Sequence, residues 1–173
     1  VIGIGLVGAF HAEAFMRNPS SDLIAICDID LQRVKNLADN YNCNYYTDYK
    51  DLIEKEDLDA ISIATPESVR LEPAILSSLK NLKILLEKPL GKNIGEIENL
   101  VNFLKDYNEL ISVNFILHEE PRYKYMKEKI KNKEIGRIVS CFGRRRGNRF
   151  GIEKYAPWTD LLSFDPISNN KSL

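Results

Sequence analysis

Short apolar or aromatic runs alternate with stretches of helical periodicity over residues 1–118. The runs predict strands, at residues 1–4, 23–27, 44–46, 60–64, 83–86 and 110–115. Apolar side chains at helical spacing predict helices between them, at residues 9–17, 31–41, 48–55 and 94–104. Most strands are apolar throughout rather than alternating, as expected where helices cover both faces of a parallel sheet. The pattern therefore predicts a doubly wound, mostly parallel α/β sheet.

Local signals indicate where several helices begin. Asp30 and Asn93 stand immediately before helical stretches and are placed to accept backbone N–H groups as N-caps. The helix after the fourth strand has two solutions, because Pro73 cannot sit deep inside a helix. Either that helix kinks at Pro73, or residues 66–71 form a loop and the helix begins near Glu72.

The last part of the chain differs from the rest in charge. Residues 1–118 carry 11 basic and 18 acidic side chains, whereas residues 119–173 carry 13 basic and 7 acidic ones. This part predicts a helix opened by Pro121, a strand-like run at 138–142 and an arginine cluster at 144–146. One interpretation is an anionic partner such as nucleic acid, and the other is a solvated basic helix with one arginine cluster. The isoelectric point of about 6.2 favours the second, because it lacks the basic footprint of a nucleic-acid-binding domain.

Length and composition fit a globular protein. The chain has 173 residues, of which 44% are hydrophobic and 28% charged, and this is enough to bury a core. No run of about 18 apolar residues predicts a membrane span, and no basic segment with a following apolar stretch predicts a signal peptide. The three cysteines form no Cys-x-x-Cys pair, so we expect no disulfide framework or zinc site, and a cytoplasmic location.

A glycine motif follows the first predicted strand. Gly3, Gly5 and Gly8 match G-x-G-x-x-G, which on its own is a weak signal. Here the motif opens a helix, and Asp28 lies 20 residues after Gly8 at the end of the second strand. This context indicates a Rossmann fold that binds a dinucleotide, with the pyrophosphate on the free N–H groups of the helix N-terminus. The alternatives are a glycine turn that binds nothing and an aspartate that only ends its strand.

Asp28 bears on the choice of cofactor. Its carboxylate is placed to accept hydrogen bonds from the adenosine ribose hydroxyls, and it repels a 2′-phosphate. The next residue is Ile29 rather than arginine, so NAD is favoured over NADP. Arg33, one turn into the following helix, could soften that preference.

Other polar positions are candidates with less support. Glu87 and Lys88 end a strand, where ligands of such sheets bind, so a functional site and an ordinary strand end are both compatible with them. His11 could reach a ligand, but a polar surface position is the favoured interpretation. His118 lies where the sheet domain gives way to the tail, and neither histidine has metal-ligand spacing around it.

With these motifs in order, the chain resembles the glucose–fructose oxidoreductase / inositol dehydrogenase / MocA family. The matching pieces are Gly3–Gly8 with Phe10-His11-Ala12, Ile26-Cys27-Asp28, Tyr46–Tyr49, Ala64-Thr65-Pro66, Glu87-Lys88-Pro89, Pro121-Arg122-Tyr123, Ile135–Ile138 and Arg144-Arg145. The glycine loop is shared with many dehydrogenases, whereas its combination with Glu87-Lys88-Pro89 is much more specific.

The resemblance implies an NAD(P)-dependent oxidoreductase. It would transfer a hydride between the nicotinamide and a hydroxyl-bearing carbon of a sugar, cyclitol or nucleotide sugar, with Lys88 as the catalytic candidate. The implied cofactor-binding residues are Gly3, Gly5, Leu6, Val7, Gly8, Asp28, Ile29, Ala64, Thr65, Pro66, Glu87 and Lys88. The cofactor domain would span residues 1–118, and an α+β open-sheet domain that binds substrate would begin in residues 119–173. We expect a homo-oligomer for the full-length protein.

Both ends of the chain depart from the family pattern. Only Val1 and Ile2 precede Gly3, fewer than the roughly 5–6 residues of an ordinary strand, so the central strand is expected to be clipped. Only 55 residues follow position 118, too few for the substrate sheet. We therefore expect a fragment or a truncated product, and a non-catalytic NAD-sensing module is the alternative to an enzyme.

Individual positions depart as well. Arg70 stands where many relatives carry histidine, and His118 stands where many carry arginine. The Asp-x-x-x-His motif of the second domain is absent, because Phe164 occupies the histidine position four residues after Asp160. The identity of the catalytic base is therefore open, and we expect this chain alone to turn over sugar substrates poorly.

Overall fold

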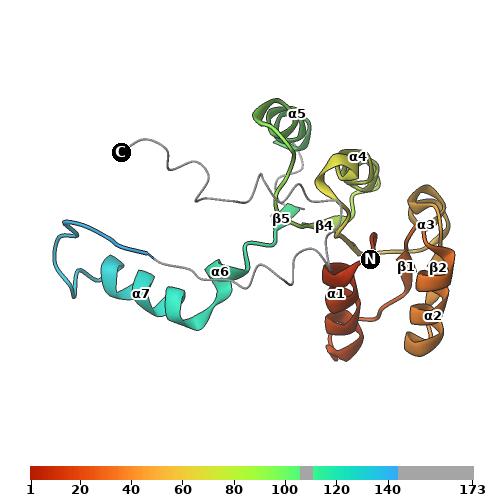
Figure 1. Ribbon diagram of the computed structural model, residues 1–173, viewed down its shortest axis with the longest axis horizontal. Helices are drawn as coiled ribbons and strands as arrows, with labels where there is room; N and C mark the ends of the chain where they lie inside the picture. The colour runs from red at the N-terminus through yellow and green to blue at the C-terminus, as the bar shows by residue number, and fades with distance from the viewer. Residues whose placement is uncertain (106–110, 144–173) are drawn as a thin grey trace, which may run out of the picture. The chain divides into compact units, whose positions relative to one another are not determined.

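The computed structural model describes residues 1–105 and 111–143 (Figure 1). The chain divides into two compact units, Val1–Lys124 and Tyr125–Leu173. All the named strands lie in the first unit. No helix in the described part of the chain is long and apolar enough to cross a membrane.

The strands form one parallel arrangement joined through the first residues of the chain. They are β1 (Ala25–Cys27), β2 (Asn44–Tyr46), β3 (Ala60–Ile63), β4 (Lys83–Leu86) and β5 (Ile111–Val113). β1 pairs with β2, and β4 pairs with both β3 and β5. Ile2 bridges the two sets, because it pairs in parallel with Cys27 on one side and Ile63 on the other. The order is therefore β2, β1, the Ile2 segment, β3, β4, β5, which is the strand order of a doubly wound dinucleotide-binding sheet.

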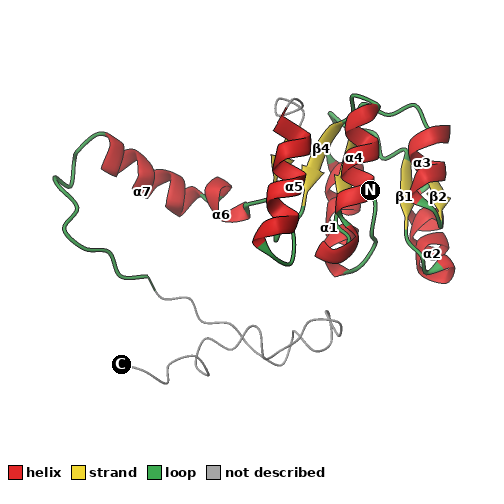
Figure 2. Cartoon of the chain, turned by 90° about the horizontal axis from the view of Figure 1, so that it is seen from above, coloured by secondary structure: helices red, strands yellow, loops and turns green. Residues whose placement is uncertain are grey.

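Helices cover both faces of this sheet, as the continuous apolar strands predict. In Figure 1, α1 (Leu6–Arg17) and α2 (Leu31–Tyr41) lie on one side of the sheet. The other side carries α3 (Tyr49–Lys55), α4 (Leu71–Leu79) and α5 (Ile94–Leu104), and Figure 2 shows α4 alongside β4. Successive residues of β1 pack into opposite cores: Ala25 and Cys27 join one apolar cluster and Ile26 the other. The predicted α/β fold is confirmed.

The helix starts follow the local signals. Asp30 Oδ1 accepts the Arg33 N–H at 3.0 Å, and Asn93 Oδ1 accepts the Glu96 N–H at 3.0 Å, so both N-caps are confirmed. Of the two solutions around Pro73, the structure adopts the second. The loop contains a 3-10 turn (Glu67–Val69), and α4 begins at Leu71, which puts the proline in the first turn where its missing N–H costs no helical hydrogen bond.

In the tail, the structure confirms one predicted element and contradicts another. After the short α6 (Ile116–Glu119), α7 (Pro121–Lys131) begins at the expected proline. The strand predicted at 138–142 is wrong, because these residues form no regular structure. Val139 and Phe142 are 85% and 89% exposed, and an apolar run becomes a strand only where a neighbour pairs with its backbone. The arginine cluster at 144–146 and the segment with Asp160 and Phe164 lie outside the described residues.

Candidate active site

The residues expected to bind a cofactor follow the strands at the same end. Gly3 follows the Ile2 segment, Asp28 follows β1, Ala64–Pro66 follow β3, and Glu87 and Lys88 follow β4. Because the strands are parallel, their carboxyl ends meet at one edge of the sheet. Ligands of open α/β sheets bind at that edge, beside the point where the strand order reverses. Here that point lies between the Ile2 segment and β3.

The glycine loop is tightly packed at Gly3 and Gly8, whereas at Gly5 it faces open space. Gly3 has φ +83°, and a Cβ built on Gly8 would lie 1.7 Å from the Gly3 carbonyl oxygen, so the helix can pack against the loop only without a side chain. A Cβ on Gly5 would meet nothing within 4 Å. Gly5 is the N-cap of α1, no side chain caps this helix, and its first turn holds no acid. The open side therefore presents backbone N–H groups that can bind an anion.

Asp28 is fixed against this loop by backbone groups. Its Oδ2 accepts the Ile4 N–H at 2.7 Å, and its Oδ1 accepts the Asp30 N–H at 3.0 Å. Arg33 Nη1 lies 3.4 Å from the same Oδ1, while Arg33 Nη2 pairs with Asp30 Oδ2 at 3.2 Å. Ile29 beside it is 93% exposed. The carboxylate can accept ribose hydroxyls, and the nearby guanidinium is already shared between two aspartates.

The loop after β3 closes against the glycine loop. A Cβ on Gly3 would lie 2.9 Å from the Thr65 backbone nitrogen, so the two segments touch through backbone atoms. Thr65 Oγ1 is buried and finds no hydrogen-bond partner among the residues that the structure describes. A buried hydroxyl without a partner is costly, and a polar ligand group in the cleft would satisfy it. Together with the open side of Gly5, this hydroxyl fits a bound dinucleotide.

Glu87 lies in a buried polar cluster that the sequence did not predict. Its Oε1 is 3.2 Å from His11 Nε2 and accepts a hydrogen bond from Asn114 Nδ2, while its Oε2 accepts the Lys88 N–H at 3.1 Å. His11 Nδ1 is 2.7 Å from the Ser62 hydroxyl. Lys88 itself is exposed. The cluster thus joins Glu87, the residue that precedes Lys88, to side chains from three other parts of the chain: His11 on α1, Ser62 on β3 and Asn114 after β5.

The expectation that His11 is a surface residue is wrong. Its side chain is 12% exposed, because α1 packs on the sheet and directs this residue toward the carboxyl ends of the strands. Burial lowers the pKa of His11 below its ordinary value of 6.5, although the charge of Glu87 acts to raise it. His118 lies on α6 with its ring against Phe115, and among the described residues it makes none of the contacts of this cluster.

Arg70 joins the two loops that border the candidate site. Its guanidinium donates hydrogen bonds to the carbonyl oxygens of Thr65, Glu87 and Pro89. The residue is 3% exposed, and burial lowers the pKa of its guanidinium. The sequence marked Arg70 only as a departure from the family pattern, because nothing in its spacing shows that it turns inward. Asn114 had a usable signal, since it follows a strand as Asp28 and Glu87 do.

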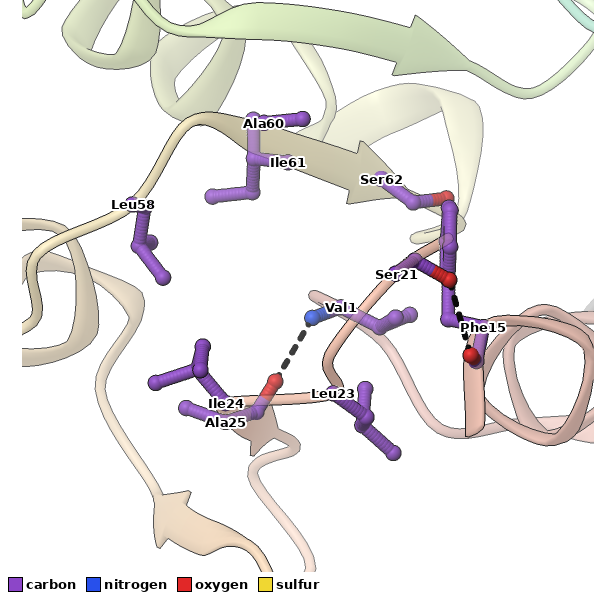
Figure 3. Close-up of a pocket in the computed structure, with 10 residues that line it drawn as sticks. All are labelled: Val1, Phe15, Ser21, Leu23, Ile24, Ala25, Leu58, Ala60, Ile61 and Ser62. Carbon is purple, nitrogen blue, oxygen red and sulfur yellow. Dashed lines mark hydrogen bonds between the residues drawn. The ribbon is translucent and has the colours of Figure 1, made fainter. Parts of the chain in front are cut away.

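A cavity of about 110 Å³ opens at the opposite edge of the sheet (Figure 3). It is lined by Val1, Phe15, Ser21, Leu23, Ile24, Ala25, Leu58, Ala60, Ile61 and Ser62. These residues stand around the amino ends of β1 and β3, and most of their side chains are apolar. None of the expected site residues lines this cavity.

A doubly wound sheet with a glycine loop at its switch point and an aspartate after the next strand defines a dinucleotide-binding domain. The comparison with protein families narrows this class. Residues 1–115 match the GFO/IDH/MocA family, described as an oxidoreductase family with an NAD-binding Rossmann fold. The chain belongs to this family.

Individual relatives agree with the family. The uncharacterized oxidoreductase YrbE of Bacillus subtilis is 31% identical over 137 residues, which are 79% of this chain and 40% of that protein. Inositol 2-dehydrogenase of Rubrobacter xylanophilus is 30% identical over 149 residues, which are 84% of this chain and 43% of that enzyme. The structure of myo-inositol 2-dehydrogenase from Lactobacillus plantarum superposes with a TM-score of 0.74 at 28% identity, over 80% of this chain and 42% of that one. The chain thus spans about two fifths of the length of these relatives.

Proposed function

We propose that this chain is the NAD-binding part of a dehydrogenase that acts on a cyclitol or a related sugar. The observation that carries the proposal is the placement of Asp28 and of Glu87-Lys88 on either side of the glycine loop, along one edge of the sheet. This edge offers a carboxylate for the adenosine ribose, free N–H groups for the pyrophosphate, and polar side chains where the nicotinamide would lie. NAD supplies the acceptor for the hydride.

Each residue then has a defined part in binding. Asp28 accepts the ribose hydroxyls, and the exposed Ile29 offers an apolar surface to the adenine. The first turn of α1, with Gly5, Leu6, Val7 and Gly8, donates N–H groups to the pyrophosphate. Ala64, Thr65 and Pro66 border the cleft, and the Thr65 hydroxyl hydrogen-bonds the nicotinamide half of the cofactor.

Lys88 is the residue that we assign to catalysis. It is exposed directly after β4, where it can hydrogen-bond the reacting hydroxyl or the nicotinamide ribose. Hydride removal from a carbon also needs a base that takes the hydroxyl proton. We propose that the base comes from a second domain that begins at residue 119 and whose larger part lies beyond these residues.

The substrate class, location and assembly are parts of the same proposal. A cyclitol or sugar is supported by the inositol 2-dehydrogenase of Rubrobacter xylanophilus, which matches over 84% of this chain. Free thiols at Cys27, Cys43 and Cys141 support a cytoplasmic location. Homo-oligomerisation belongs to the full-length protein, because the second domain of this family often pairs subunits.

The test is formation of NADH from a panel of inositols and sugars. We expect weak or no turnover by the 173-residue chain and clear turnover by a longer form that includes a complete second domain. In that longer form, Lys88→Ala should remove most of the activity while NAD still binds. NAD binding without turnover by the longer form on any cyclitol, sugar or nucleotide sugar would instead support an NAD-sensing module.

A further inference from the structure

The Glu87 carboxylate receives donors from three separate parts of the chain. His11 comes from the second turn of α1, Asn114 follows β5, and the Lys88 N–H comes from the next residue. A buried carboxylate is stable only when its oxygens are paired, so each of these donors constrains where the carboxylate lies. Glu87 is 5% exposed. Its orientation is therefore determined by its neighbours rather than by solvent.

The contacts of His11 select one tautomer. Burial lowers its pKa, so the ring is neutral near pH 7 and carries a single N–H. Because Nε2 faces the carboxylate oxygen of Glu87 at 3.2 Å, the proton belongs on Nε2, where it is donated to that oxygen. Nδ1 then accepts the hydroxyl proton of Ser62 at 2.7 Å. With this assignment Asn114 Nδ2, which is 3.2 Å from Nε2, donates its hydrogen to Glu87 instead.

We propose that His11 is a positioning residue for Lys88. The neutral ring accepts a hydrogen bond from Ser62 and donates one to Glu87 Oε1. This fixes the carboxylate so that Glu87 Oε2 accepts the backbone N–H of Lys88. Because His11 lies on the helix whose N-terminus forms the pyrophosphate site, one side chain links that site to the residue assigned to catalysis. This inference rests on the proposed function for the role of Lys88, but the hydrogen-bonded chain from Ser62 to Lys88 can be tested without it.

The test compares His11→Leu with His11→Gln in the 173-residue chain. Leucine fills the space without a donor, whereas glutamine carries an amide N–H that can reach the position of Nε2. We expect His11→Leu to move the Lys88 amide proton resonance upfield and to remove its protection from hydrogen exchange. His11→Gln should retain most of both, and rescue by the donor alone separates positioning from packing. An unchanged Lys88 amide in His11→Leu contradicts the proposal.

Ligand binding supplies a second readout. Nicotinamide mononucleotide and AMP probe the two halves of the cofactor separately. We expect His11→Leu to weaken nicotinamide mononucleotide about tenfold, the usual effect of losing one hydrogen bond to a charged group, and to leave AMP within about twofold. Equal loss of both ligands would mean a general structural defect and would overturn the positioning role. Should the wild-type chain bind neither ligand, the proposed function fails, and the Lys88 amide alone then decides the role of His11.

Ser62→Ala provides a further test that remains usable if a His11 variant does not fold. This substitution removes one oxygen from a fully buried side chain and leaves His11 in place. Nitrogen-15 spectra of the imidazole should show the Nε2-protonated tautomer in the wild-type chain and in Ser62→Ala, where Glu87 still accepts the Nε2 proton, and the Nδ1 resonance should shift in Ser62→Ala because its hydrogen bond from Ser62 is lost. A wild-type ring protonated on Nδ1 would contradict the proposed direction of the hydrogen bonds. His118→Gln assigns the two histidine signals.

Discussion

The two ends of the carboxyl edge are built in different ways. At the Asp28 end, the contacts are made by backbone N–H groups of Ile4 and Asp30 and by one half-exposed arginine. At the Glu87 end, four side chains meet below the surface, one from α1, one from β3 and two from the residues that follow β4 and β5. The first end depends on a short motif and one aspartate. The second depends on residues up to 103 positions apart that meet only when the whole sheet is assembled.

The glycines should show the largest effects and separate folding from binding. Gly8→Ala places a Cβ 1.7 Å from a backbone oxygen, so we expect a loss of about 3 kcal/mol of stability or failure to fold. Gly5→Val puts its side chain into open space, and we expect stability to stay within about 1 kcal/mol while NAD binding is abolished. Denaturant unfolding and calorimetric titration measure the two quantities.

Replacing Arg144, Arg145 and Arg146 together should leave NAD binding nearly intact.

A pair of arginines compares the two ends directly. Arg70→Met leaves three backbone carbonyls at the Glu87 end without their donor, and we expect a loss of about 3 kcal/mol in the free energy of unfolding. The matched control is Arg33→Met at the Asp28 end, where the side chain is 51% exposed and its ion pairs are weak. There we expect a change below about 1 kcal/mol. Equal losses in the two variants would show that Arg70 does not join its two loops.

Cofactor choice should depend on the Asp28 end alone. Asp28→Asn removes the charge that repels a 2′-phosphate, so we expect NAD to bind roughly tenfold more weakly and the preference over NADP to shrink. Asp30→Asn serves as the control, because asparagine still caps α2 while the partner charge of Arg33 is lost. Titration of both cofactors into each variant gives the ratio of affinities. If Asp28→Asn left the ratio unchanged, Asp28 would not set the preference.

Protonation of His11 should give the smallest effect. Its pKa is lowered in the folded chain by burial, so between that value and 6.5 the unfolded chain binds more protons. Stability should therefore fall as pH decreases through this window, and more steeply in the wild-type chain than in His11→Gln. Urea unfolding between pH 7 and pH 5 measures the difference. An identical slope in the wild-type chain and in His11→Gln would contradict the lowered pKa of His11.

The sequence predicted the fold and placed Asp28, Glu87 and Lys88 after their strands, but it did not predict which side chains would surround Glu87. Continuous apolar strands and capped helices are local patterns, and Asp28 stands at a fixed distance from the glycines. By contrast, burial of His11 follows from which face of α1 meets the sheet, and the contacts of Arg70 follow from how two loops approach each other. The apolar run at 138–142 failed for a related reason, since strand formation depends on a pairing partner that residue types do not specify.

The most direct test of the account maps NAD and its two halves, AMP and nicotinamide mononucleotide, on the isotope-labelled chain by NMR. AMP should shift amide resonances of residues 4–8 and 28–30, and nicotinamide mononucleotide should shift those of Ala64, Thr65, Glu87 and Lys88. NAD should shift both sets and leave the cavity around Val1 and Leu58 unchanged. Shifts that gather at that cavity, or AMP shifts at Glu87 and Lys88 instead of Asp28, would contradict the placement of the cofactor along the carboxyl edge.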